Sequence, residues 1–138
     1  MEQVTLARAT AAIQASLAHA RQKSLAPLTV VVLDAGGHVR ASAREDGAGH
    51  SGIDIASAKA RGALSFSMSS RKVAEIFGGN AALCATLAAT MHGQMLPIPG
   101  AVLINDPAGR VIGAIAAAGD APDNDEAAAI AGLSALRT

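Results

Sequence analysis

Two extended segments of this chain are separated by only four residues, and this spacing constrains the fold more than any other feature of the sequence. Residues 28–34 (LTVVVLD) form a continuous apolar run rich in β-branched residues, which is typical of a strand covered on both faces. Residues 35–38 (AGGH) predict a turn, after which residues 39–43 return as a second strand. Because a parallel crossover needs about a dozen residues or more, the two strands are expected to form an antiparallel hairpin.

A second hairpin is expected in the last third of the chain. Residues 101–105 and 111–118 have strand character and flank the sequence DPAG at 106–109. Proline in this sequence occupies position i+1 of a type I turn, for which its fixed φ is suited. One face of the second strand would carry Ile112, Ala114, Ala116 and Ala118, small enough for a helix or a flat ligand to approach closely.

The remaining segments predict helices. The i, i+3, i+4 spacing of apolar residues indicates an amphipathic helix over residues 5–21. Ser51 with Asp54, and Asp123 with Glu126, have the spacing of capping boxes, which would start a helix running to about residue 66 and the C-terminal helix. Two shorter helices are expected in between, the first capped by Ser69 or Ser70 and the second by Asn80.

The resulting order is α-β-β-α-α-α-β-β-α. Two hairpins separated by helices indicate an α+β fold in which the helices pack on an antiparallel sheet. The 138 residues contain no linker, repeat or low-complexity segment, so we expect one domain spanning 1–138.

Composition argues against several classes of function. Lys plus Arg and Asp plus Glu are both 11, so the chain lacks the basic surface that nucleic acids or anionic membranes attract. Trp and Tyr are absent, which removes the aromatic groups on which bases stack. The polar N-terminus lacks the pattern of a signal peptide, and no apolar run is long enough for a membrane span. We therefore expect a cytoplasmic protein with neither nucleic-acid nor membrane partners.

The lone cysteine and the alanine-rich core lead to two further expectations. Cys84 excludes an internal disulfide and any multi-cysteine metal motif, and it is expected to be a buried, inert thiol. The 51% hydrophobic content comes from Ala and small aliphatic residues, which bury little area per residue. Because association is one way to bury more apolar surface, a homo-oligomer is predicted.

Residues 47–52 (GAGHSG) match G-x-G-x-x-G and precede a helix, yet they do not predict a dinucleotide site. That motif requires the first turn of a parallel βαβ unit, whereas a hairpin precedes this loop. A simpler possibility remains, since the N–H groups of Gly49, His50 and Ser51 lie at a helix N-terminus, where a carboxylate or phosphate is favoured. The alternative is a surface loop with an ordinary helix cap.

Lys59 is placed unusually on its helix. The stripe that should meet the sheet contains Ile53, Ala56, Ala60, Ala63 and Leu64. Lys59 falls instead on a largely apolar face with Ile55, Gly62 and Phe66. An ammonium group there would bind an anionic ligand, have a lowered pKa, or pair with Glu126 or a nearby aspartate. The alternative is a side chain whose stem covers apolar surface and whose charge reaches water.

The C-terminal helix begins in an acidic segment. Glu126 is either the second half of a capping box or a recessed acid with a raised pKa. Asp120, Asp123 and Asp125 lie close by in sequence. Their crowding suggests a cation or a cationic ligand, but stabilisation of the helix dipole explains them equally well.

The histidines carry no zinc pattern. His19, His38, His50 and His92 show none of the spacings of zinc motifs, so no metal site is predicted. His19 is expected on the polar face of the first helix. His38, His50 and His92 are expected in a turn and in loops, where each is a candidate axial ligand of a haem iron.

Several motifs together resemble the GlcG/HbpS-like family, which also includes the C-terminal domain of PduO proteins. They cover nearly the whole chain and comprise residues 32–38 (VLDAGGH), 44–47 (REDG), 51–60 (SGIDIASAKA), 97–100 (PIPG), 113–115 (GAI) and 123–127 (DNDEA). The resemblance implies a compact α+β fold similar to profilin-like domains, commonly assembled as multimers. Some members of that family bind haem or corrinoid, and others are encoded with pathways that process small organic acids. The chain departs from the pattern at Ala101, where a second glycine is usual, and has no E-x-x-E pair.

Three functional hypotheses follow. The first is a small-molecule-binding protein, with haem the first ligand to test, whose pocket is formed by residues 44–51, Lys59 and residues 119–126. Its ligand-binding residues would be Arg44, His50, Ser51, Lys59, Arg61 and Asp123. The second is a cofactor-independent enzyme acting on a small organic acid. In that enzyme Lys59 or Arg61 would hold a carboxylate, and Glu126, Asp34 or His50 would move a proton. The third is a purely structural assembly protein.

Overall fold

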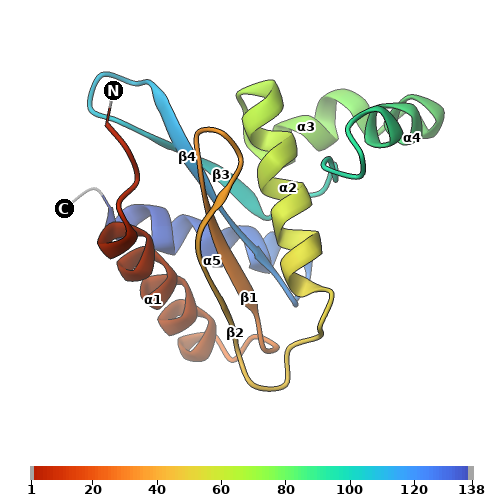
Figure 1. Cartoon of the computed structure of the whole chain (residues 1–138). Helices are drawn as coiled ribbons and strands as arrows, with labels where there is room; N and C mark the ends of the chain where they lie inside the picture. Colours follow the sequence, from red (N-terminus) through yellow and green to blue (C-terminus); the bar gives the residue numbers. More distant parts are fainter. Residues whose placement is uncertain (1, 137–138) are drawn as a thin grey trace.

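The computed structural model describes residues 2–136 and has the predicted order of elements (Figure 1). The helices are α1 (Leu6–Gln22), α2 (Gly52–Phe66), α3 (Ser70–Phe77), α4 (Ala81–Thr90) and α5 (Pro122–Ala135). The strands are β1 (Thr29–Asp34), β2 (Val39–Arg44), β3 (Ala101–Asn105) and β4 (Val111–Ala118). The predicted α+β class is confirmed, and each predicted strand lies within one residue of its observed bounds.

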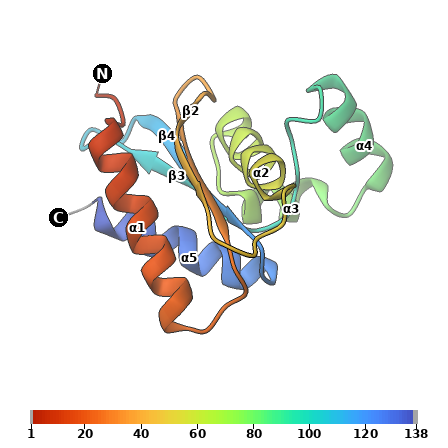
Figure 2. The ribbon, with the colours of Figure 1, turned by 60° about the horizontal axis from the view of Figure 1, so that its bottom comes forward.

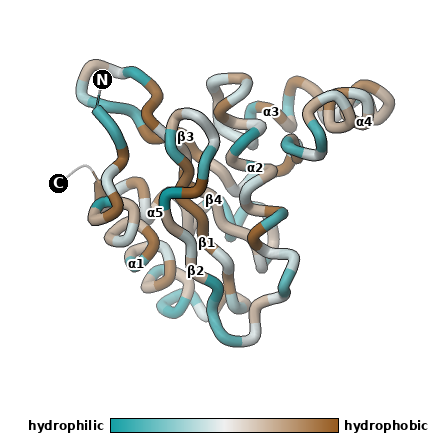
Figure 3. The backbone as a smooth tube through the Cα atoms, viewed as in Figure 1, coloured by the Kyte–Doolittle hydropathy of each residue, from teal (hydrophilic) through white to brown (hydrophobic). Residues whose placement is uncertain are grey.

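The two hairpins join into one antiparallel sheet with strand order β2-β1-β4-β3. The β1–β4 pairing connects them, with Thr29 opposite Ala118 and Asp34 opposite Gly113. Burial explains why β1 and β4 are central. Residues Thr29 to Leu33 of β1 are all buried, whereas β2 at the edge is largely exposed or half-buried. In Figure 3 the apolar residues of β1 lie along the middle of the sheet, and the polar segment between β2 and α2 lies at its end.

Helices cover both faces of the sheet. Helices α1 and α5 lie on one face and α2 lies on the other (Figures 1 and 2). The predicted contact stripe of α2 is confirmed, since Ala56, Ala60 and Ala63 are buried against the sheet with Ile53 and Leu64 beside them. They meet Ala114, Ala116 and Ala118 of β4, whose small side chains let the helix approach closely.

Ile112 does not share that small face, contrary to the sequence prediction. Its side chain lies in the core on the other side of the sheet, with α1 and α5. The register of β3 and β4 shifts between Ile104 and Asn105, where the partner changes from Gly113 to Val111. A bulge of this kind interrupts the alternation of side chains on which the prediction relied.

Helix α3 begins at the sheet, where Ser70 Oγ accepts the Ala101 N–H of β3, and α4 extends away from the sheet (Figure 2). Their predicted caps are confirmed, because Ser69 Oγ accepts the Lys72 N–H at 3.2 Å and Asn80 Oδ1 accepts the Leu83 N–H at 3.0 Å. Helix α4 contains no buried residue. Between residues 2 and 136, we find no helix with the length and apolar character needed to cross a bilayer.

Both predicted capping boxes are wrong. Ser51 is the N-cap of α2, but its side chain makes no capping hydrogen bond. Helix α5 begins two residues earlier than predicted, at Pro122, with Ala121 rather than Asp123 as its N-cap. Proline is favoured at this first position because the missing N–H would have no partner there, so Asp123 is not needed as a cap.

Candidate functional site

Lys59 is fully buried and paired inside the protein. Its side chain is 1% exposed, and its ammonium group donates to Asp125 Oδ2 at 3.1 Å and to the Ala117 carbonyl at 3.0 Å. The pair joins α2 on one face of the sheet to α5 on the other. A Cβ at Gly100 would lie 2.6 Å from Lys59 Nζ, so glycine is needed beside it. Lys59 therefore does not reach water as a snorkelling lysine would.

The acidic segment at the start of α5 is also occupied by internal contacts. Burial raises the pKa of Asp125, although Lys59 and the Asp120 N–H both favour its ionised form. Asp123 and Glu126 both bind Arg71 of α3, with 3.0 Å from Arg71 Nε to each oxygen of Glu126. Glu126 thus anchors α3 to α5 rather than completing a helix cap.

A hollow of about 320 Å³ opens at the N-terminus of α2. The lining residues come from β1, the segment before α2, α2 itself and the end of β4: Thr29, Gly49, His50, Ser51, Gly52, Ile55, Ala118 and Gly119. Of the residues predicted to bind ligand, His50 and Ser51 lie here. Arg44 lines a different hollow together with Glu45 and Asp46, where Glu45 pairs with Arg21 at 3.0 Å.

Asp34 and His38 lie together at the β1–β2 turn. Asp34 Oδ1 accepts the N–H groups of Gly36 and His38, each at 3.0 Å, and lies 3.5 Å from His38 Nδ1. Burial alone would raise the pKa of Asp34, but these N–H donors and the nearby His38 and Arg40 hold it below its usual value. An acid held in its ionised form by backbone donors is better suited to fixing a turn than to exchanging protons.

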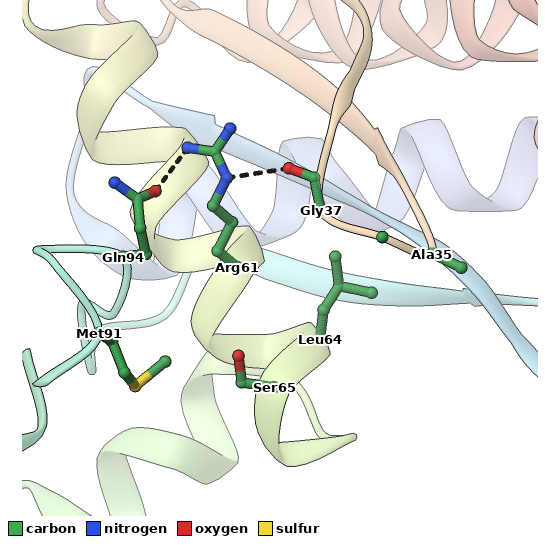
Figure 4. A pocket seen from close by; sticks show the side chains of 8 residues that line it. Ala35, Gly37, Arg61, Leu64, Ser65, Met91 and Gln94 are labelled. Carbon is green, nitrogen blue, oxygen red and sulfur yellow. Dashed lines mark hydrogen bonds between the residues drawn. The ribbon is translucent and has the colours of Figure 1, made fainter.

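Arg61 lines a hollow of about 340 Å³ on the other side of that turn, against the segment that follows α4. Its Nε donates to the Gly37 carbonyl at 2.9 Å, and its Nη1 donates to Gln94 Oε1 at 2.5 Å. Figure 4 shows these two bonds holding the guanidinium between Gly37 and Gln94, with no bond drawn to its third nitrogen. The rest of the wall is formed by Ala35, Gly36, Leu64, Ser65 and Met91.

No carboxylate within residues 2–136 forms an ion pair with this guanidinium. Arginine presents its N–H groups in a planar fork that matches the two oxygens of a carboxylate. The two neutral acceptors hold the fork in place and leave its positive charge uncompensated. The arrangement is suited to an organic anion with an apolar part that contacts Leu64 and Met91.

The predicted site residues therefore do not form one pocket. His50 and Ser51 share one hollow, and three further hollows are lined by Arg44, by Asp34 with His38, and by Arg61. Ion pairs hold the remaining three residues, Lys59, Asp123 and Glu126. His92 is exposed in the turn after α4, at a φ of 55°. Gln94 and Met91 carried no signal in the sequence, because their segment contacts Arg61 only through the tertiary fold.

Neither the cysteine nor any metal-ligating cluster adds a further site. In the part of the chain that the structure describes, no group of three or more His, Cys, Asp or Glu side chains is placed to hold a metal ion. Cys84 is half-buried rather than buried as predicted, and its thiol donates to the Phe77 carbonyl at 2.9 Å.

Comparison with known proteins identifies the family. The family model for haem degrading protein HbpS-like matches residues 4–134. The chain belongs to the HbpS-like family. No curated protein sequence gives a significant match.

Solved structures share the HbpS-like fold over nearly the whole chain. The protein ORFY of Klebsiella pneumoniae is 24% identical with a TM-score of 0.89, covering 100% of this chain and 94% of its own. A double mutant of Streptomyces reticuli HbpS is 26% identical with a TM-score of 0.84, covering 99% and 88%. PduOC in complex with haem is 20% identical with a TM-score of 0.86, covering 97% and 95%.

Proposed function

We propose that this HbpS-like protein binds a small organic anion in the hollow lined by Arg61, and that haem is the first such ligand to test. The observation that carries the proposal is the guanidinium of Arg61, fixed by Gly37 and Gln94 and unpaired with any carboxylate of the described residues. A ligand carboxylate would supply the missing charge. Hollows of about 300 to 1,000 Å³ are usual for small ligands, and this one, at about 340 Å³, is near the lower end.

The family's description as haem-degrading proteins supports haem as a ligand, as does the haem complex of PduOC, which has the same fold. Haem carries two carboxylates on an apolar ring. Arg61 fits a carboxylate of this kind, and Leu64 and Met91 fit the edge of an apolar ring. The hollow would hold only that edge, so the iron would be ligated from outside it. The candidates are His92, in the turn that follows Met91, and His38, in the β1–β2 turn.

No observation favours the enzyme hypothesis in the same way. Of its proposed groups, Lys59 and Glu126 are held in ion pairs, and Asp34 accepts two backbone N–H bonds. His50 lines a different hollow from Arg61, so the two are not placed to act on one small substrate. A proton-transfer residue needs a free position beside its substrate.

Calorimetric titration with acetate, lactate, succinate and haem tests the proposal. For the anion that binds the wild type, Arg61→Gln should weaken binding at least tenfold, about 1.4 kcal/mol. The reason is that glutamine lacks the positive charge and the paired N–H donors of the guanidinium. Arg61→Lys should also weaken it, since an ammonium lacks the fork. Arg44→Gln is the control, because Arg44 lines a separate hollow together with Glu45 and Asp46. Equal binding by the wild type and Arg61→Gln would refute the proposal.

A further inference from the structure

The first turn of α2 differs from those of α1, α3 and α4 in having no side-chain cap. The N–H groups of Ile53 and Asp54 have no acceptor within residues 2–136, and the Ser51 side chain makes no capping bond. At α1 and α3, by contrast, Thr5 and Ser69 cap the helix. Unpaired N–H groups and the positive end of the helix dipole attract anions, but a helix terminus alone does not make a site.

Thr29 supplies an independent observation in the same hollow. Thr29 is 1% exposed, and its hydroxyl oxygen is buried without a hydrogen-bond partner among the described residues. Two other buried hydroxyls have partners, since Ser16 donates to the Ala128 carbonyl at 2.8 Å and Ser70 accepts the Ala101 N–H at 2.9 Å. Leaving a buried hydroxyl unpaired is destabilising, so a ligand in the hollow could supply the partner that the described residues do not.

Gly52 places the hydroxyl against the first turn of α2. A Cβ at Gly52 would lie 2.5 Å from Thr29 Oγ1, so any side chain there would collide with the hydroxyl. Thr29 and Gly52 both line the hollow of about 320 Å³, together with His50, Ile55 and Gly119. The hydroxyl and the free end of the helix thus belong to one small site.

We propose that this hollow binds the oxyanion of a small ligand, a carboxylate or a phosphate, using the Thr29 hydroxyl and the N–H groups of Ile53 and Asp54. The site is distinct from the Arg61 hollow, which lies more than two turns further along α2, and does not depend on it. Asp54 is the one acidic residue of the first turn, and it is exposed. Its charge opposes anion binding and gives a means of testing the proposal.

Titration with sodium phosphate and sodium acetate, followed by backbone amide NMR, tests the site. The amide signals of Ile53 and Asp54 should shift and saturate, and the anion that saturates at the lower concentration identifies the class. The amides of Arg8 and Lys72 should not move, because Thr5 and Ser69 already occupy them. Shifts that stay linear in both salts, or that are equal at these capped amides, would overturn the proposal.

Two variants make the test specific. Thr29→Val replaces the unpaired hydroxyl with a methyl group of similar shape, so it should weaken binding at least threefold while the melting temperature holds or rises. Asp54→Asn, at an exposed position, should strengthen binding at least twofold. A fall in melting temperature in Thr29→Val would show that the hydroxyl has a structural partner, and unchanged affinity in both variants would show that neither group faces the anion. Either result would overturn the assignment.

Discussion

An ammonium group that is shielded from water needs its charge paired and its protons bound by acceptors. Lys59 meets both conditions through Asp125 and the Ala117 carbonyl. The pair connects helices on opposite faces of the sheet. Because each charge is buried, removing one leaves the other uncompensated, which costs more than the intact pair contributes.

Lys59→Met should therefore destabilise the protein by roughly 3 kcal/mol at pH 7, measured by denaturant unfolding. Burial already raises the pKa of Asp125, and without the opposing charge of Lys59 it should rise further in the variant, which gives the loss a pH dependence. An acid whose pKa is higher in the folded state than in the unfolded state favours folding as it takes up its proton. The deficit of the variant should therefore shrink as the pH falls from 7 towards 4. Adding Asp125→Asn should recover part of the lost stability at pH 7. A stable single variant would contradict the structural pair.

The position of Lys59 was apparent from the sequence, but its partner was not. The helical period placed it on an apolar face with Ile55 and Gly62, where its charge would either pair or reach water, and the sequence did not decide between the two. The partner lies on α5, 66 residues away in sequence, and its approach depends on the end of β4 and on Gly100. Glu126 and Asp125 differ by one position on their helix, too little for sequence spacing to decide between them.

At the scale of elements, small residues let helices cross closely. Ser16 of α1 donates to the Ala128 carbonyl of α5, and Gly132 of α5 faces the same crossing. A Cβ at Gly132 would lie 2.3 Å from Ser16 Oγ and 2.8 Å from the Ala12 carbonyl oxygen. The strands and the two helices α1 and α5 could be predicted from their hydrophobic periods. Their close crossing could not, because it depends on how the two helices meet in the fold.

Gly132→Ala should destabilise the protein by roughly 2 kcal/mol, in the range of overpacked cores, even though alanine favours helix formation. Thermal unfolding monitored by circular dichroism measures the effect. Gly79→Ala is the control, since a Cβ at Gly79 meets nothing within 4 Å. Equal melting temperatures for wild type and Gly132→Ala would show that the crossing has room to adjust.

At the scale of the whole molecule, the fold leaves apolar surface unburied. Ile76 of α3 is 52% exposed and Leu83 of α4 is 40% exposed. No Asp, Glu, Lys or Arg occurs between residues 76 and 105, a segment that includes all of α4. The alanine-rich composition predicted that one chain alone would bury little apolar area. The extension of α4 away from the sheet was not predicted, because its N-cap and its helical period fit a packed helix equally well.

We expect a symmetric homo-oligomer, at least a dimer, because association would cover this surface. Multi-angle light scattering at micromolar concentration should give a mass of at least twice the chain's 13.6 kDa. A mass of one chain across the accessible concentration range would contradict the prediction.

The hollow of Arg61 is assembled from three separate parts of the chain. The guanidinium comes from α2, Gly37 from the turn of the first hairpin, and Gln94 from the segment between α4 and β3. Only the turn and the arginine could be singled out from the sequence. The β1–β2 hairpin and α2 bring them together.

Titration with haem, followed by its Soret absorption, tests most directly whether this hollow is the binding site. The wild type should give a sharp band that saturates at one haem per chain, Arg61→Gln should weaken binding at least tenfold, and either His38→Ala or His92→Ala should shift or broaden the band. His50→Ala is the control, because His50 lies in the hollow at the other end of α2. A broad band of equal strength in the wild type and all four variants would mean nonspecific adsorption and would contradict haem binding at Arg61.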